Sequence, residues 1–208
     1  IEACLVGSEM CIRDRPYASP EGLFLPETYF IQSGDTDLDV LIRARAAMQD
    51  ALMGAWSARN KSLPLTEPYE ALILASIIEK ETGVASERPE IAGVFARRLA
   101  LGMRLQTDPT VIYGLGAEFS GNLTRRHLRD DNNPFNTYRI AGLPPTPIAL
   151  PGKEAIMASL NPTDGEALYF VAKGDGSHAF SRTLSEHEEN VRRYQLKRRK
   201  DYRSSPKQ

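Results

Sequence analysis

The chain has 208 residues, which is enough for one domain with a full hydrophobic core, alone or with a small appendage. Hydrophobic residues make up 41% of it and charged residues 25%, as in ordinary soluble globular proteins. The formal net charge of -1 excludes the strongly basic footprint of a nucleic-acid-binding protein, so we expect no nucleic-acid partner.

The N-terminal residues look foreign to the rest of the chain. Residues 5–15 match the translated end of a transposon-type sequencing adapter, so we interpret residues 1–15 as an artefact of sequence assembly. Both cysteines, Cys4 and Cys11, lie there, and we predict no disulfide, zinc site or cysteine nucleophile from them. The first residue is not Met, so the sequence says nothing about a signal or membrane segment ahead of it.

The first half of the remaining chain predicts one loop and one long helix. Residues 21–30 predict a turn and then an extended segment, because Pro26 is incompatible with a central strand. Residues 36–60 have helical spacing, and we expect one broad buried face, made of Leu38, Leu41, Ile42, Ala46, Leu52 and Trp56. Residues 61–68 form a Pro-containing connection after this helix.

Residues 71–83 are the most informative stretch of the sequence. They predict an apolar helix with Pro68 in its first turn and Gly83 as a left-handed cap at its end. Near that end, Glu81 shares a helical face with three apolar residues, Leu74, Ile77 and Ile78. A carboxyl group on a buried face has a raised pKa, as a general acid near neutral pH requires. The alternative, a Glu81 that tips into solvent, is equally compatible with this helix alone.

The next part of the chain predicts shorter helices and a long loop. Residues 107–116 become a short helix, and residues 123–128 predict another. Residues 132–152 are rich in Pro, Asn and Thr and predict an irregular loop of the kind that often carries function. Before them, a helix is expected from an N-cap at Ser86 to Gly102, with a buried face of Ile91, Val94, Phe95, Leu99 and Leu101.

The C-terminal part contains the β structure. A short helix is predicted at residues 153–160, a strand at 167–172 and a second strand at 178–181 after a glycine-containing turn. Residues 184–202 predict a polar helix, and the basic tail at 196–208 is best read as a solvated end. Together the elements predict an α+β fold, a mainly helical domain with a small β element.

Six sequence blocks carry a resemblance to a known family. They are Glu-Gly-Leu-Phe-Leu-Pro-Glu-Thr-Tyr at 21–29, Ala-Ser-Ile-Ile-Glu-Lys-Glu-Thr at 75–82, Arg-Leu-Gln-Thr-Asp-Pro-Thr-Val-Ile-Tyr-Gly at 104–114, Phe-Asn-Thr-Tyr at 135–138, Gly-Leu-Pro-Pro-Thr-Pro-Ile at 142–148 and Tyr-Phe-Val-Ala at 169–172. In this order they resemble the endolytic murein transglycosylase family of bacterial cell-wall enzymes, also called YceG-like. The Gln-Thr-Asp-Pro-Thr block is the most specific of them.

The resemblance implies an enzyme and a location. The enzyme is a lyase that cleaves nascent peptidoglycan strands internally, between N-acetylmuramic acid and N-acetylglucosamine, and leaves 1,6-anhydromuramyl ends. The catalytic domain is expected over residues 16–205, on the periplasmic side of the inner membrane. A membrane helix and a LysM-like module are expected ahead of it and are missing from this chain. Peptidoglycan strands and penicillin-binding synthases are the implied partners.

The resemblance also implies a lysozyme-like site with a single catalytic glutamate at a helix end. In lysozyme-like transglycosylases the catalytic Glu is followed by Ser, and Glu81 followed by Thr82 resembles that arrangement better than Glu79 followed by Lys80. One carboxyl group suffices, because the C6 hydroxyl group of the sugar replaces water as the nucleophile. Glu79 lies on another side of the helix, and we expect it to hold a hydrogen bond in the cleft or to pair with a nearby basic residue.

Five further residues are expected to bind substrate. The cluster of Gln106, Thr107 and Asp108 is expected to line the sugar groove, with Asp108 steadying positive charge at the anomeric carbon. Alternatively, Thr107 and Asp108 cap the helix that follows. Asn136 and Tyr138 are expected to contact the sugar through an amide group and an aromatic ring. Their alternatives are hydrogen bonding within the loop and core packing.

The remaining residues favour no metal or cofactor. His127, His178 and His187 lack metal-ligand spacing. His178, near the turn between the strands, either reaches the cleft or lies at the surface, and we expect the surface position. Two other functions remain open. One is a muramidase-type hydrolase that uses Asp108 as a second carboxylate, and the other is a non-catalytic peptidoglycan-binding scaffold.

Overall fold

The computed structural model describes residues 19–196, so residues 1–15 and nearly all of the basic tail lie outside it. The predicted α+β class is confirmed. Short 3-10 turns occur at Ala85–Glu87 and Gly116–Glu118, and a π-helical turn at Arg192–Leu196. The main elements are α1 (Asp37–Ser57), α2 (Pro68–Glu81), α3 (Arg88–Ala100), α4 (Asp108–Leu115), α5 (Arg125–Leu128), α6 (Lys153–Leu160), β1 (Tyr169–Ala172), β2 (His178–Ser181) and α7 (Leu184–Val191).

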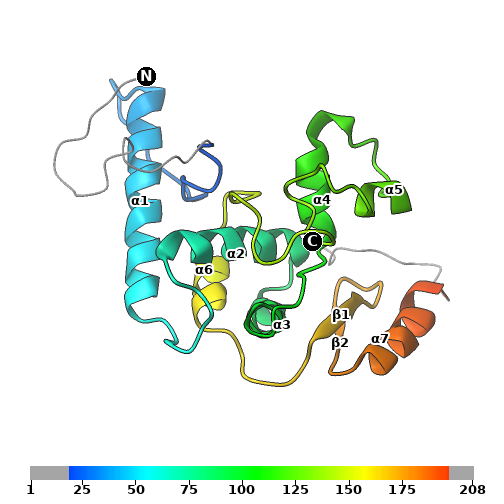
Figure 1. Ribbon diagram of the computed structural model, residues 1–208. Helices are drawn as coiled ribbons and strands as arrows, with labels where there is room; N and C mark the ends of the chain where they lie inside the picture. Colours follow the sequence, from blue (N-terminus) through cyan, green and yellow to red (C-terminus); the bar gives the residue numbers. More distant parts are fainter. Residues whose placement is uncertain (1–18, 197–208) are drawn as a thin grey trace.

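Helix α2 runs through the centre of the molecule (Figure 1). It packs against α1, α3, α4 and α6, and every residue from Ala71 to Ile78 is buried. A helix enclosed on all sides requires apolar residues around its whole circumference. Leu72 and Ala75 are therefore as buried as Leu74, and the expectation that one apolar face distinguishes Glu81 from Glu79 is wrong.

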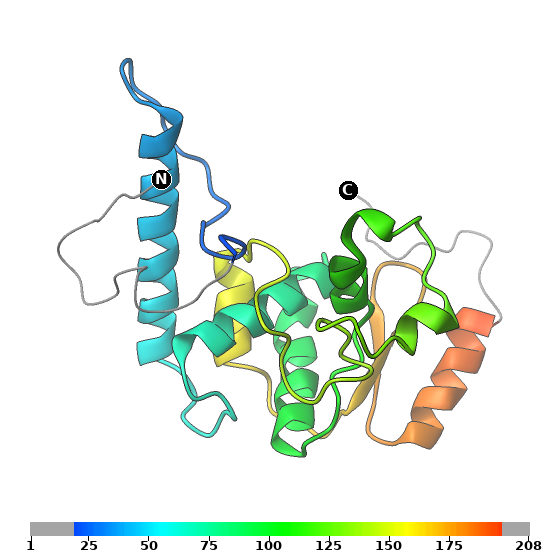
Figure 2. The same ribbon diagram turned by 45° about the horizontal axis from the view of Figure 1, so that its top comes forward.

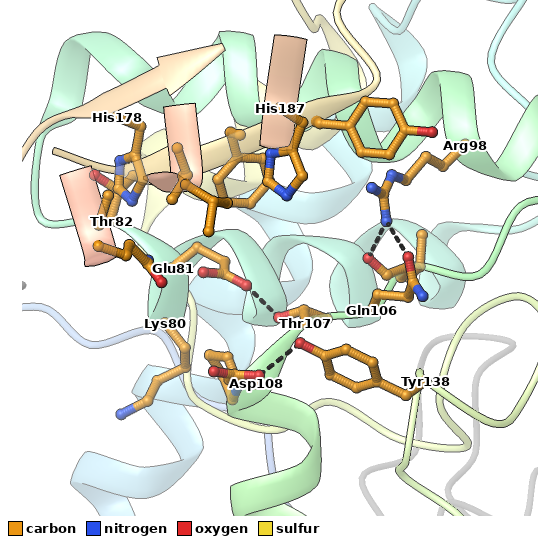
Figure 3. Close-up of a pocket in the computed structure, with 18 of the residues that line it drawn as sticks. Lys80, Glu81, Thr82, Arg98, Gln106, Thr107, Asp108, Tyr138, His178 and His187 are labelled. Atoms are coloured by element: carbon orange, nitrogen blue, oxygen red, sulfur yellow. Dashed lines mark hydrogen bonds between the residues drawn. The ribbon is translucent and has the colours of Figure 1, made fainter. Parts of the chain in front are cut away.

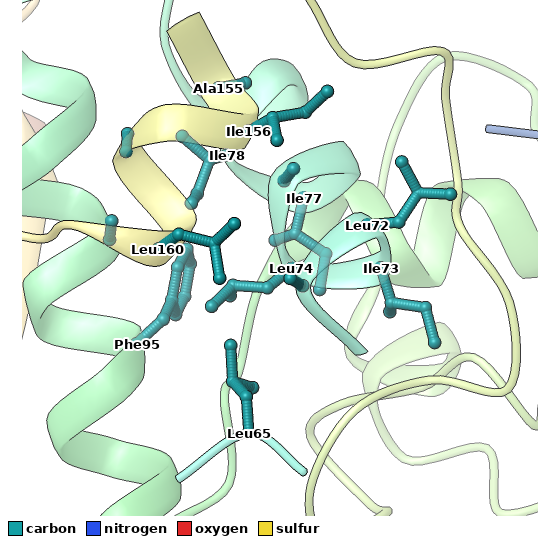
Figure 4. Close-up of a cluster of buried hydrophobic side chains, with 14 of the residues drawn as sticks. Leu65, Leu72, Ile73, Leu74, Ile77, Ile78, Phe95, Ala155, Ile156 and Leu160 are labelled. Atoms are coloured by element: carbon teal, nitrogen blue, oxygen red, sulfur yellow. The ribbon is translucent and has the colours of Figure 1, made fainter. Parts of the chain in front are cut away.

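The core that holds α2 is one continuous cluster (Figure 4). Phe95 of α3 and Leu160 of α6 close over the middle of α2, and Leu65 packs there from the preceding connection. Each large side chain buried in this way contributes roughly 1.5–3 kcal/mol relative to an exposed one. The tight packing fixes the direction in which the last turn of α2 points.

Helix α1 lies along one side of the molecule, and its N-terminal half extends beyond the body (Figure 2). The predicted buried face is partly wrong, because Leu38 is 42% and Leu41 46% exposed. Helix α1 packs against α2 and α6, and the residues that it buries are Ala44, Met48 and Ala55, two of which are small. Small side chains allow close approach of helices, and the larger Leu52 and Trp56 pack at the edge of this contact.

The junction between α2 and α3 differs from its prediction. Gly83 does not adopt a left-handed conformation, because the chain leaves α2 through an extended Thr82 with φ -142° and ψ 136°. Ser86 lies inside a 3-10 turn and is not the N-cap of α3, which begins at Arg88. Of the three helix-end predictions at Gly83, Ser86 and Gly102, the one at Gly102 is confirmed, because this residue ends α3 in a left-handed conformation with φ 67°.

Strands β1 and β2 form an antiparallel hairpin in which Tyr169 pairs with Ser181 and Ala172 with His178. Helix α7 packs on both strands, on the side of the molecule away from α1 (Figure 1). The polar helix predicted for residues 184–202 ends at Val191 and continues as a π-helical turn, and its remainder lies outside the described residues. Within residues 19–196, no helix has the length and apolar character needed to span a bilayer.

Candidate active site

The last turn of α2 opens into a pocket of about 860 Å³ (Figure 3). Distant parts of the chain form its walls: the end of α2, the segment leading into α4, the loop that carries Tyr138, the two strands, helix α7 and Arg98 of α3. Glu79, Glu81, Gln106, Thr107, Asp108 and Tyr138 all line it. The structure therefore brings together six of the seven residues expected from the sequence.

Glu81 is the most strongly perturbed carboxyl group of the pocket. Burial raises its pKa from 4.5 to about 7, with an opposing effect of the hydrogen bond from Thr107 and a small further rise from the charge of Asp108. The Thr107 hydroxyl group donates that hydrogen bond to Oε1. Glu81 as a whole residue is partly exposed, and it lines the pocket. Both its acid and its base form are accessible near neutral pH.

Thr107 is held in place from its backbone. Its N–H donates to Thr137 Oγ1 at 3.0 Å, and the preceding Gln106 has φ 53°, a strained conformation for a residue other than glycine. The guanidinium group of Arg98 donates to the Leu105 carbonyl at 2.8 Å and to Gln106 Oε1 at 3.4 Å. With its hydroxyl group on Glu81, Thr107 stands at the N-cap of α4 without a side-chain capping bond.

Asp108 and Tyr138 form a hydrogen-bonded pair in the wall next to Glu81. The Tyr138 hydroxyl group donates to Asp108 Oδ1 at 2.7 Å. Burial, the main cause, and the neighbouring Asp108 charge raise the pKa of Tyr138, so the phenol keeps its proton. Asp108 uses its side chain for this pair and not for capping α4. Its position beside Glu81 disfavours a second negative charge there.

Glu79 has partners that Glu81 lacks. Its Oε2 accepts a hydrogen bond from the Gly152 N–H at 3.1 Å, and Arg88 lies 3.7 Å from Oε1. These contacts tie the last turn of α2 to the loop before α6. Glu79 therefore has the hydrogen bond and the basic partner expected for it.

Asn136 does not line the pocket. It is fully buried, and its amide group donates to the carbonyls of His127 at 3.2 Å and Asp130 at 2.8 Å. Its Oδ1 accepts from the Tyr138 N–H at 3.1 Å. The expected contact with substrate is therefore wrong, and the alternative of hydrogen bonding within the loop is correct. Asn136 orders the segment that carries Tyr138.

The pocket contains further residues that were not expected to bind substrate: Arg98, Tyr169 and His187. His178 also lines it and so reaches the cleft, but it is only 7% exposed, and the expected surface position is wrong. The order of elements alone does not reveal that a two-stranded hairpin packs beside the end of α2. Among residues 19–196, no group of three or more His, Cys, Asp or Glu side chains could hold a metal ion.

One shielded carboxyl group at a helix end, with a pKa near neutrality and hydroxyl groups around it, is suited to general acid–base catalysis. The chain belongs to the YceG-like family, whose model it matches over residues 5–193. The matched range begins at residue 5, inside the segment that we interpret as an assembly artefact. Sequencing of the locus tests whether residues 1–15 belong to the gene.

The chain is similar in sequence to two bacterial proteins and in structure to a third. The chain is 36% identical to an endolytic murein transglycosylase of Bacillus subtilis, over 84% of this chain and 48% of that protein. It is 34% identical to one of Streptococcus pneumoniae, over 82% of this chain and 31% of that protein. A crystal structure of a protein described as YceG-like from Listeria monocytogenes superposes with a TM-score of 0.69 at 37% identity, over 82% of this chain and 55% of that one. The chain spans about half or less of the length of the curated relatives that it matches.

Proposed function

We propose that this domain is a lytic transglycosylase that cleaves peptidoglycan strands internally, between N-acetylmuramic acid and N-acetylglucosamine, and so ends strand elongation. The observation that carries the proposal is Glu81, a pocket carboxyl group whose burial raises its pKa to about 7. The names of the two bacterial relatives support the substrate and the reaction. No cofactor is needed for this chemistry.

In the proposed reaction, the protonated Glu81 donates its proton to the glycosidic oxygen as the bond to C1 breaks. The N-acetylglucosamine unit leaves with a free hydroxyl group. The Glu81 carboxylate then takes the proton of the C6 hydroxyl group of the same N-acetylmuramic acid, and O6 bonds to C1. Glu81 is protonated again at the end, and no water molecule enters the balance.

The neighbouring residues have separate proposed roles. Thr107 holds the Glu81 carboxyl group in one orientation through its hydrogen bond. The negative charge of Asp108 stabilises the developing positive charge at the anomeric carbon, and Gln106 and Tyr138 contact the sugar. Glu79 orders the edge of the cleft from its contacts with Gly152 and Arg88. This placement of one catalytic glutamate at a helix end is the lysozyme-like feature of the proposal.

The substrate also sets the proposed location. Peptidoglycan lies outside the cytoplasmic membrane, so we place the catalytic domain, residues 16–205, on the periplasmic side, attached by a single membrane span. Penicillin-binding synthases, which produce the strands, are the proposed partners. Fractionation of cells that express the complete gene product, followed by protease accessibility, tests the location.

The decisive experiment compares the products that three proteins form from uncross-linked glycan strands. Glu81→Gln is expected to lower strand cleavage at least about 10²-fold, because it removes the proton donor and keeps the shape. Glu79→Gln is expected to retain activity within about tenfold, because Glu79 acts on the loop and not on the glycan. Mass spectrometry of the wild-type products is expected to detect 1,6-anhydromuramyl ends.

Three outcomes contradict the proposal. Reducing ends in place of anhydro ends indicate a muramidase-type hydrolase. Full activity of Glu81→Gln, with activity lost in Glu79→Gln, reverses the assignment of the two glutamates. Binding of strands without cleavage by the wild-type protein indicates a scaffold.

A further inference from the structure

His178 and Glu87 form a buried pair beside the proposed acid, at a place that the reaction described above does not use. His178 Nδ1 lies 2.8 Å from Glu87 Oε2, and the His178 N–H donates to Glu87 Oε1 at 2.9 Å. The side chains are only 7% and 14% exposed, respectively. Glu87 thus holds the first residue of β2 through both of its oxygens.

The same carboxylate reaches the residue that follows Glu81. Thr82 Oγ1 lies 3.5 Å from Glu87 Oε2 and accepts a hydrogen bond from the Val84 N–H at 3.0 Å. Figure 3 places His178 and Thr82 together at one end of the pocket, with the Glu81 carboxyl group beside them. Glu87 therefore links the chain after α2 to β2, and any shift of one changes the position of the other.

The contacts with Glu87 assign a tautomer to the imidazole. One carboxyl oxygen of Glu87 accepts from the His178 N–H and the other faces Nδ1, so we assign Nδ1 as the donor to Glu87. In the neutral imidazole Nε2 is then an acceptor. Phe170 packs edge-on against the ring, with 5.5 Å between ring centroids. Among the described residues, only the Nδ1 side of the ring has a hydrogen-bond partner, and His178 lines the pocket.

We infer that His178 is a second residue that contacts the substrate, and that its Nε2 accepts a hydrogen bond from a hydroxyl group of the glycan. Glu87 is the positioning residue that fixes its tautomer and its orientation. The inference rests on the proposed function for the identity of the ligand. His178 would thus add a hydrogen-bond acceptor to the pocket. Across the pocket, the Tyr138 hydroxyl group already donates its hydrogen bond to Asp108.

Two substitutions separate a contact with substrate from a purely structural role. In His178→Asn the amide group can replace Nδ1 as the donor to Glu87, but nothing replaces Nε2. In His178→Gln the longer side chain can present its amide oxygen near the former position of Nε2, and the bond to Glu87 is lost. His127→Asn, on α5 and away from the lining of the pocket, is the matched control.

Binding is measured by titrating soluble, uncross-linked peptidoglycan strands into full-chain proteins that also carry Glu81→Gln, which prevents turnover. His178→Asn is expected to weaken binding roughly threefold to tenfold, the value of one neutral hydrogen bond, and His178→Gln to weaken it less. In proteins with Glu81 intact, the same order is expected in KM. ¹⁵N NMR of the imidazole is expected to identify Nε2 as unprotonated and to detect its shift when strands bind.

The contrary results are equally specific. If His178→Asn binds strands as tightly as His178→Gln or more tightly, the side chain only holds β2, and the inference is wrong even when the wild-type protein cleaves strands. If the wild-type protein leaves strands intact but His178→Asn still weakens binding, the proposed lyase activity fails and the contact stands. If no strand binds any of these proteins, both are overturned. Melting temperatures of both variants identify any loss that comes from unfolding.

Discussion

Glu81 is held in a pocket that raises the pKa of its carboxyl group from 4.5 to about 7, mainly because burial disfavours the ionised form. An unfolded chain restores the ordinary pKa. Between the two values the folded state binds a proton that the unfolded state has released. The favourable contribution of the neutral group is therefore present below pH 4.5 and is lost as the pH rises through about 7.

This linkage predicts that Glu81→Gln is more stable than the wild-type protein above pH 7. A neutral amide group has no ionised form to be buried, and the pKa difference corresponds to at most about 3 kcal/mol. Urea unfolding at pH 8 is expected to detect the gain, and the two proteins are expected to converge near pH 4. Glu79→Gln is the control, since it weakens the contacts of Glu79 with Gly152 and Arg88 and is expected to bring no gain in stability. If the wild-type protein is more stable than Glu81→Gln at pH 8, the claim that burial disfavours the ionised form of Glu81 is wrong.

Thr107 provides a second prediction at the residue scale. Its hydrogen bond favours the ionised form of Glu81 and lowers the pKa that burial raises. Thr107→Val has almost the same shape without the donor, so the pKa of Glu81 is expected to rise further. The acid form then persists to higher pH, and the alkaline limb of the kcat/KM profile shifts upward. Thr107→Ser restores the donor and is expected to restore the profile. An unchanged profile in Thr107→Val would mean that another group titrates.

At the scale of elements, helix positions were predictable from local patterns and helix contacts were not. Pro68, the apolar run after it and Gly102 mark the ends of their helices correctly because those signals act within one turn. The buried side of α1 could not be predicted, since it depends on where α2 and α6 pack, and they bury Ala44 and Met48 while Leu38 stays exposed. The extended Thr82 was not predicted either, and its hydroxyl group lies 3.5 Å from Glu87 Oε2, a contact that depends on how the chain turns after α2.

Helix α2 also holds the irregular loop that precedes α6. Ser76 Oγ accepts a hydrogen bond from the Ile148 N–H at 2.9 Å and donates to the Ile73 carbonyl at 2.7 Å, entirely within the core. Ser76→Ala leaves the Ile148 N–H buried without a partner. An unsatisfied buried donor costs about 1–3 kcal/mol, so we expect a loss of that size in the free energy of unfolding.

Ser159 is the matched control for this prediction. It is as buried as Ser76, and its hydroxyl group donates at 2.8 Å to the Ile156 carbonyl of its own helix, where the loss of a donor leaves no backbone N–H unpaired. Ser159→Ala is expected to cost less than about 1 kcal/mol. Equal losses in the two variants, measured by denaturant unfolding, would show that Ser76 does not support the loop.

At the scale of the whole molecule, the pocket is an assembly of distant segments, and this limits what the sequence can reveal. Glu81, Thr107, Asp108 and Tyr138 were identified from their motifs, and the fold brings them to one pocket. His178 was expected at the surface because a polar residue beside a turn usually is exposed. Only the packing of the β1–β2 hairpin beside the end of α2 buries it, and that packing depends on contacts far apart in the sequence.

The attachment of α7 to the hairpin provides the last prediction. His187 stacks on Tyr169 with ring centroids 5.2 Å apart, and its Nδ1 is buried without a hydrogen-bond partner among the described residues. Burial, followed by the charge of Arg98, lowers the pKa of His187 below its ordinary 6.5. The stability that the neutral ring contributes is therefore present above pH 6.5 and is lost as the pH falls toward the lower pKa of the folded state.

Protonation of His187 is thus expected to loosen α7 while the core around α2 remains folded. Between pH 7 and pH 5, hydrogen exchange corrected for its intrinsic pH dependence should accelerate in α7 but not in α2, where protonation of Glu81 stabilises the folded state. His187→Phe keeps the stacked ring and removes the titrating nitrogen, so it should abolish the acceleration. If α7 of His187→Phe opens at acid pH as readily as in the wild-type protein, the wall of the pocket responds to a different group. If α2 opens together with α7, the two parts of the molecule unfold as one unit, since the hairpin then transmits the loss to the core.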